Sequence, residues 1–255
     1  MMVFSGSCNP SAGINPDGSI FGNSSLMAPD TTAIIEAESC ATWTEAGLRS
    51  PTVSALRLEV PSKASSEYQK ACGAYKDKRF SQAEDHVRKA IEIDPKYAAA
   101  WVVLGQSLVA EKKPDDARKA CSQAMAVDPT YVPPYICLAD LSAKENDWAE
   151  VSRMATQALA LDPVSDLYAF YYGAAGAFHL HNLPIAVMDA QAAAKLDTWH
   201  HFPELYLLLA RIYEVEGDLH NEVTQLKQYL KLAPDSEDSA ATRTMLAQLQ
   251  TQLAK

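Results

Sequence analysis

A seven-residue segment recurs in this chain at a fixed interval, and this repeat constrains the fold more than any other feature. The three clearest copies read KAIEIDP, QAMAVDP and QALALDP; they begin at Lys89, Gln123 and Gln157, so each lies 34 residues after the last. A degraded fourth copy ends at Thr198, and a fifth ends at Pro234. A repeat of this length is one supersecondary unit that buries its apolar face only against its neighbours. The sequence therefore predicts a solenoid.

Within each repeat the residue pattern predicts two antiparallel helices. Pro95, Pro129 and Pro163 have no amide hydrogen and cannot continue a helix, so each marks the end of a second helix. Large residues such as Trp101 and Tyr135 are expected to fill the spaces between helices. The predicted solenoid spans residues 61–255, with units at about 64–97, 98–131, 132–165, 167–200 and 203–236.

The segment after the last unit, residues 237–254, is predicted to be a capping helix. Its expected apolar face contains Ala241, Met245, Leu249 and Leu253, while Thr242 belongs to the polar face. Such a helix covers the last repeat with one face and meets water with the other.

Residues 1–60 form a separate region. They hold half of the ten glycines together with many Ser, Asn and Pro residues, which is typical of a loop-rich segment. Residues 52–60 alternate between apolar and polar, and this period of two predicts a strand. A short β-type segment and an irregular arm both fit this composition.

The repeats resemble the tetratricopeptide repeat (TPR) family, in the form found in bacterial proteins. Unit 98–131 carries the family's motif residues Trp101, Leu104, Gly105, Ala117, Ala124 and Pro129 at the expected offsets. Unit 167–200 departs most from the pattern, because Thr198 replaces its proline. The resemblance covers about residues 64–236. It implies an all-α, right-handed superhelical solenoid that binds proteins as a scaffold and has no catalytic activity.

Composition excludes several other classes of protein. The formal net charge is -10, and the chain has no basic stripe that could neutralise phosphates, so no nucleic-acid partner is expected. No apolar run is long enough to span a membrane. The first residues lack the features of a secretory signal, which indicates a cytoplasmic protein, or a periplasmic one if the N-terminus is incomplete. The oligomeric state is left open.

The five cysteines include no CxxC pair, and their odd number argues against both a zinc site and a disulfide scaffold. Cys121 and Cys137 are predicted to be small buried apolar residues. A Cys8–Cys40 disulfide is an alternative for an exported protein.

No catalytic, metal or cofactor motif is present, so no catalytic residues and no cofactor are predicted. The chain lacks a glycine-rich phosphate loop, an HExxH motif and a GxSxG motif. His179 and His181 are two residues apart, which does not place them on one face of a helix. These two residues and the pair His200-His201 are therefore interpreted as solvated or hydrogen-bonded histidines.

In TPR proteins the first helix of each unit lines a concave groove, and the resemblance implies that a protein or peptide partner binds there. The predicted groove positions are Tyr68, Tyr75, Val102, Gln106, Ile136, Asp140, Tyr168, Tyr171, Phe178, Leu207 and Arg211, with Cys72 and Val109 on the same faces. Relatives that clamp a peptide carboxylate use Lys, Asn and Arg at these places, and only Arg211 is present here. A peptide with apolar anchors is therefore predicted.

Two alternatives accompany this prediction. The protein could be an accessory or regulatory subunit that docks a catalytic partner in the bacterial envelope. Alternatively, the groove could be filled by residues 1–60 themselves, because residues 56–60 run directly into the first helix of the first unit.

Overall fold

The computed structural model describes residues 60–164, 166–198 and 202–254. These residues form eleven α-helices and no strand. In chain order the helices are α2 (Ser62–Lys76), α3 (Phe80–Ile93), α4 (Ala98–Ala110), α5 (Pro114–Val127), α6 (Pro133–Lys144), α7 (Trp148–Leu161), α8 (Leu167–His179), α9 (Leu183–Leu196), α10 (Pro203–Glu216), α11 (Leu219–Leu232) and α12 (Ser239–Leu253). The strand predicted at 52–60, the Cys8–Cys40 pair and the His200-His201 pair lie outside the described residues, except for Val60.

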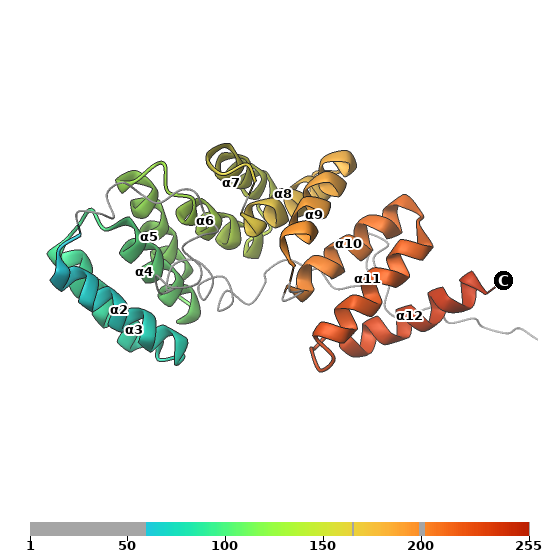
Figure 1. Cartoon of the computed structure of the whole chain (residues 1–255), viewed down its shortest axis with the longest axis horizontal. Helices are drawn as coiled ribbons and strands as arrows, with labels where there is room; N and C mark the ends of the chain where they lie inside the picture. Colours follow the sequence, from blue (N-terminus) through green and yellow to red (C-terminus); the bar gives the residue numbers. More distant parts are fainter. Residues whose placement is uncertain (1–59, 165, 199–201, 255) are drawn as a thin grey trace, which may run out of the picture.

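The helices form five antiparallel pairs stacked in an arc, followed by α12 (Figure 1). We call the first helix of each pair the A helix and the second the B helix; the A helices are α2, α4, α6, α8 and α10. Each helix packs against the next along the chain, and successive A helices also touch one another. This is the TPR solenoid that the repeat predicts. In the described part of the chain, no helix is long and apolar enough to cross a membrane.

The repeated Asp-Pro pair ends the B helices in one way. The Oδ1 atoms of Asp94, Asp128 and Asp162 accept the amide hydrogen of the residue two positions further on, at 3.0, 3.0 and 3.2 Å. Each aspartate thus closes a local turn around the proline that stops the helix. The recurring pair is therefore a structural signal for the turn between units.

The turn between the A and B helix of each unit also repeats. In every unit one residue has a left-handed backbone: Lys78, Lys112, Asn146 and His181 have φ values of 58°, 61°, 60° and 59°, and Gly217 has 74°. The amides of these residues and of those that follow them donate hydrogen bonds to the last carbonyls of the A helix. Only glycine adopts this conformation without steric cost, so four units accept that cost in order to keep the same helix-to-helix turn.

Aromatic side chains link one unit to the next. Trp101 Nε1 donates a hydrogen bond to Pro95 O at 2.9 Å, and Tyr135 OH donates to Pro129 O at 2.8 Å. Tyr206 OH donates at 3.2 Å to the aspartate carboxylate at the end of the preceding B helix. Trp101 is half-buried at this junction and packs against the edge of the core, whereas Tyr135 and Tyr206 are buried.

The capping helix differs from the prediction in its buried face. Helix α12 buries Ser239, Thr242, Met245 and Leu249, whereas Leu253 is 46% exposed and Ala241 is also exposed. Thr242 tolerates complete burial because its hydroxyl donates to Asp238 O at 2.8 Å. The prediction was right for Met245 and Leu249 and wrong for Ala241, Leu253 and Thr242. It placed Thr242 by polarity alone, whereas a threonine whose hydroxyl is hydrogen-bonded can be buried like an apolar residue.

Candidate partner-binding surface

The predicted groove residues all lie on A helices. Tyr168, Phe178 and Arg211 are half-buried, and the other eight are buried. Their arrangement follows from a property of the central A helices, which are buried over runs of consecutive residues: 102–108, 134–143, 171–177 and 205–210. Because successive residues of a helix point about 100° apart, each run covers every direction around its axis. The partner-binding role of the eleven residues remains a prediction.

Asp140 belongs to a buried polar network that connects two A helices. Its Oδ1 accepts a hydrogen bond from Tyr172 OH at 3.0 Å, and its Oδ2 accepts one from Lys144 Nζ at 2.7 Å. Burial raises the pKa of this carboxyl, while Lys144 and Tyr172 oppose that rise. Both carboxylate oxygens are thus used within the protein, which gives Asp140 a structural task in holding α6 against α8.

An aromatic cluster surrounds the N-terminal half of α8. The ring of Phe202 lies 4.6 Å from the Tyr171 ring and 5.4 Å from the Tyr168 ring, measured between centroids, and both contacts are edge-on. Tyr171 is fully buried, and burial raises its pKa well above the ordinary tyrosine range. Among the predicted groove residues of α8, Tyr168 and Phe178 are the aromatic residues that retain partial exposure.

Two polar groups lie among these apolar positions. Gln106 is 6% exposed, and its Oε1 has no hydrogen-bond partner among the described residues. Arg211 Nε lies 3.2 Å from Glu214 Oε2 on the next turn of α10. A buried amide oxygen without a donor is costly, so Gln106 marks a place where an incoming N–H group would be stabilised.

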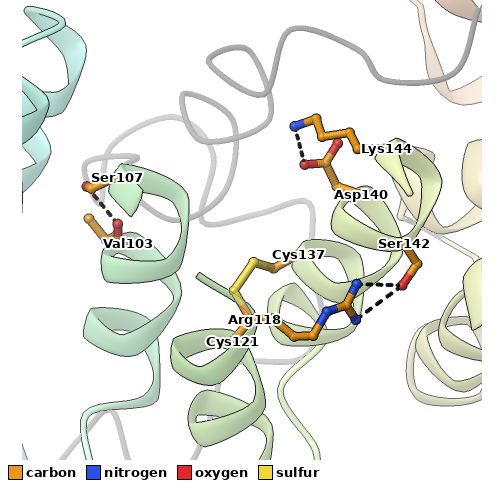
Figure 2. Close-up of a disulfide and its surroundings, with 8 residues drawn as sticks. All are labelled: Val103, Ser107, Arg118, Cys121, Cys137, Asp140, Ser142 and Lys144. Carbon is orange, nitrogen blue, oxygen red and sulfur yellow. Dashed lines mark hydrogen bonds and ion pairs between the residues drawn. A yellow bond between two sulfur atoms is a disulfide. The ribbon is translucent and has the colours of Figure 1, made fainter. Parts of the chain in front are cut away.

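A disulfide joins the second and third units at the side of this surface (Figure 2). It connects Cys121 on α5 to Cys137 on α6, with the two Cα atoms 6.1 Å apart. Next to it, the Arg118 guanidinium donates to Ser142 Oγ and pairs with Glu145 Oε2 at 2.7 Å. Two kinds of link therefore fasten the same pair of helices.

This disulfide corrects the cysteine interpretation. Cys121 and Cys137 are buried as predicted, at 0% and 6% exposure, but they are bonded to each other. They are 16 residues apart and match no disulfide motif. The pairing arises because the second half of each B helix faces the start of the next A helix. Gly105 on α4 lies against this disulfide, and a Cβ at this position would overlap Cys121 Sγ.

The described histidines lie in separate surroundings. His179 stacks on the Trp148 ring with centroids 3.8 Å apart, whereas His181 occupies a left-handed turn. His86 Nδ1 lies 2.7 Å from Glu67 Oε2, and together with Lys70 it lowers the pKa of Glu67 to about 2. Within 60–164, 166–198 and 202–254, no group of three His, Cys, Asp or Glu residues could hold a metal ion.

Comparison with known families and proteins identifies the repeat. Two family models, both described as tetratricopeptide repeat, match residues 74–136 and residues 203–236. The second match coincides with the predicted fifth unit. A comparison of the sequence with curated proteins gives no significant match.

Solved structures share the fold at low sequence identity. The crystal structure of the APC/C hetero-tetramer Cut9-Hcn1 matches 77% of this chain at 19% identity with a TM-score of 0.66; this chain spans 38% of that one. PilW, a type IV pilus biogenesis factor, matches 75% of this chain and 87% of its own at 20% identity, with a TM-score of 0.65. TTC0263, a thermophilic TPR protein from Thermus thermophilus, matches 74% and 99% at 17% identity, with a TM-score of 0.57.

Proposed function

Because the chain belongs to the tetratricopeptide repeat family, we propose that it is a non-catalytic scaffold that binds a peptide or protein partner along the inner face of its A helices. The observation that carries this proposal is the pair of half-buried aromatic side chains at the predicted groove positions of α8, Tyr168 and Phe178. Aromatic residues that keep one accessible side on a rigid helix supply large contact areas at low entropic cost.

The polar groups of the surface support a partner with main-chain donors. Gln106 Oε1 receives no hydrogen bond within the described part of the chain and would accept one from a peptide N–H group. The surface otherwise offers few charges, so apolar anchors would provide most of the binding energy. Cut9-Hcn1 is a hetero-tetramer, which is a precedent for a related fold acting through assembly.

The test is an affinity pull-down with the full chain beside Tyr168→Ala and Phe178→Ala. Met188→Ala is the matched control, because Met188 lies on the B helix α9 and is 61% exposed. We expect the partner to be lost from both α8 variants and retained by the control. Retention by both α8 variants would refute this binding face. Tyr171 is a poor probe, because its complete burial means that truncation would disturb folding.

A second candidate is an accessory or regulatory subunit that docks an enzyme in the bacterial envelope. The disulfide between Cys121 and Cys137 favours it, because such bonds persist in oxidising compartments such as the periplasm and are rare in the cytosol. Purification of the chain with one enzyme at a fixed stoichiometry would support this role. A pull-down that yields several unrelated proteins through the α8 aromatics would favour the general scaffold.

A further inference from the structure

Side chains on the inner side of the arc have almost no exposed surface, although no described helix packs against that side. Helix α4 packs against α2, α3, α5 and α6, and α6 and α8 have the corresponding four neighbours. Two of the four are A helices at the sides and two are B helices behind, so the inner side of each A helix faces the opening of the arc (Figure 1). Yet Val102, Ile136 and Leu207, at predicted groove positions, are 0%, 2% and 1% exposed.

The only long stretch of chain outside the described residues is 1–59, and it joins the first A helix directly at Val60. An extended chain spans about 3.3 Å per residue, whereas neighbouring helix axes are about 10 Å apart. The segment is therefore long enough to run past all five A helices. It contains several apolar residues such as Leu56 and Leu58, which suit an apolar groove.

Cys72 supplies an independent argument. It lies on α2 at a predicted groove position, is 6% exposed and is disulfide-bonded. The chain has five cysteines, and Cys121 and Cys137 are bonded to each other. A partner for Cys72 within the chain is therefore Cys8 or Cys40, and both belong to residues 1–59.

We propose that residues 1–59 occupy the concave groove of their own solenoid and are fastened there by a disulfide between Cys72 and either Cys8 or Cys40. In this arrangement Cys8 and Cys40 do not pair with each other. The bond forms when two thiols lose two protons and two electrons to a small-molecule disulfide, such as oxidised glutathione, which is reduced to two thiols. An external partner would have to displace the segment, a consequence that rests on the proposed function.

The covalent part is tested by peptide mapping of the full chain without reductant. Equal amounts of unlabelled and ¹⁵N-labelled chain are mixed in reductant, reoxidised with oxidised glutathione, digested and analysed by mass spectrometry. We expect the Cys72 peptide to be joined to a peptide containing Cys8 or Cys40 of the same isotope. A free Cys72 thiol, or mixed-isotope pairs at the random frequency, would overturn the proposal, and the second result would identify another copy as the partner.

The position of the segment is tested by photo-crosslinking in the full chain. A benzophenone amino acid replaces Val109, which is half-buried at a predicted groove position on α4, or Met188 as the exposed control on α9. We expect crosslinks from position 109 to residues 1–59 of the same chain, at a yield about tenfold above that from position 188. In the Cys72→Ser variant the yield from position 109 should fall, because without the disulfide the effective concentration of the segment at the groove is lower. Equal yields from both positions would overturn the proposal. No partner is present in either experiment, so failure here leaves the pull-down test of the proposed function unaffected.

Discussion

The A and B helices have similar lengths, yet they differ in how their surfaces are covered. A B helix buries one stripe: α5 buries Ala117, Ala120, Cys121 and Ala124, and α7 buries Val151, Met154, Ala155 and Ala158. A central A helix has no open stripe, and α6 buries ten consecutive residues. The difference shows that the solenoid has two layers: the B helices expose one face to solvent, whereas the central A helices are buried in every direction around their axes.

The comparison also explains where function can reside. Substitutions on the exposed face of a B helix alter only solvent contacts, so that face can vary freely. The A helices carry both the core and the predicted partner surface, so each substitution there tests stability and binding together. The predictions below separate these contributions.

The largest effect should come from truncating an enclosed aromatic residue of an A helix. Tyr171→Ala on α8 is expected to lower the free energy of unfolding by about 3–5 kcal/mol, because Tyr171 is 0% exposed and its removal leaves a cavity. Met188→Ala on α9 should stay within about 0.5 kcal/mol. Urea denaturation of both variants measures the difference. Equal losses would mean that the two layers are not distinct.

Reduction of the Cys121–Cys137 bond should weaken the junction between a B helix and the next A helix. Closing a loop of this length is worth about 3 kcal/mol in the chain-entropy model. We expect the denaturation midpoint to fall in dithiothreitol by an amount that includes this contribution. The Cys121→Ser/Cys137→Ser double variant is the control and should show a smaller response to reductant. If dithiothreitol lowered the midpoint of the double variant as much as that of wild type, the effect of the reductant would come from the other cysteines.

Two glycines on A helices should respond to alanine in opposite directions. Gly105→Ala on α4 should cost about 1–3 kcal/mol, because the new Cβ overlaps Cys121 Sγ in a packed interior. Gly73→Ala on α2 has no heavy atom within 4 Å and should gain about 0.5–1 kcal/mol from helix propensity. Thermal unfolding distinguishes them, and a stabilised Gly105→Ala variant would mean that the disulfide does not pack against α4.

The last effect is confined to a pH range and concerns a buried acid in the B-helix stripe of α11. Glu222 is 1% exposed, and its pKa is raised to about 7, mainly by burial; Glu214 adds to the rise and Arg211 opposes it. The unfolded group has a pKa near 4.5, so the folded state holds the proton over a higher pH range. Stability should therefore fall by about 2–3 kcal/mol as the pH rises from 4.5 to 7, and level off above that range.

Glu222→Gln removes this dependence, and the comparison with wild type is best made in denaturation curves between about pH 6 and 7.5. Asp189 has a pKa of about 6 for the same physical reason, so its contribution to the pH dependence is largely complete below that window. A wild-type curve parallel to that of the variant would show that Glu222 titrates normally.

The sequence predicted the solenoid because the 34-residue interval and the Asp-Pro pairs are local signals. Those signals place the end of each B helix directly, and the two family-model matches confirm the repeat. The Cys121–Cys137 bond and the burial of Thr242 were missed because they depend on which helix faces meet and on a hydroxyl that bonds to its own backbone. Partner preference depends on what fills the groove, and no local pattern encodes that.

The aromatic links between units bear on local unfolding of the repeat array. In the fourth unit, Phe170 occupies the position that Trp101, Tyr135 and Tyr206 hold in the others, and its ring has no donor for the preceding carbonyl. A repeat array unfolds in cooperative blocks whose borders lie at the weakest interface. At the boundary between α7 and α8, the Asp140–Tyr172 hydrogen bond and the stacking of His179 on Trp148 take the place of that link. The missing donor of Phe170 therefore does not by itself make this boundary a border for local unfolding.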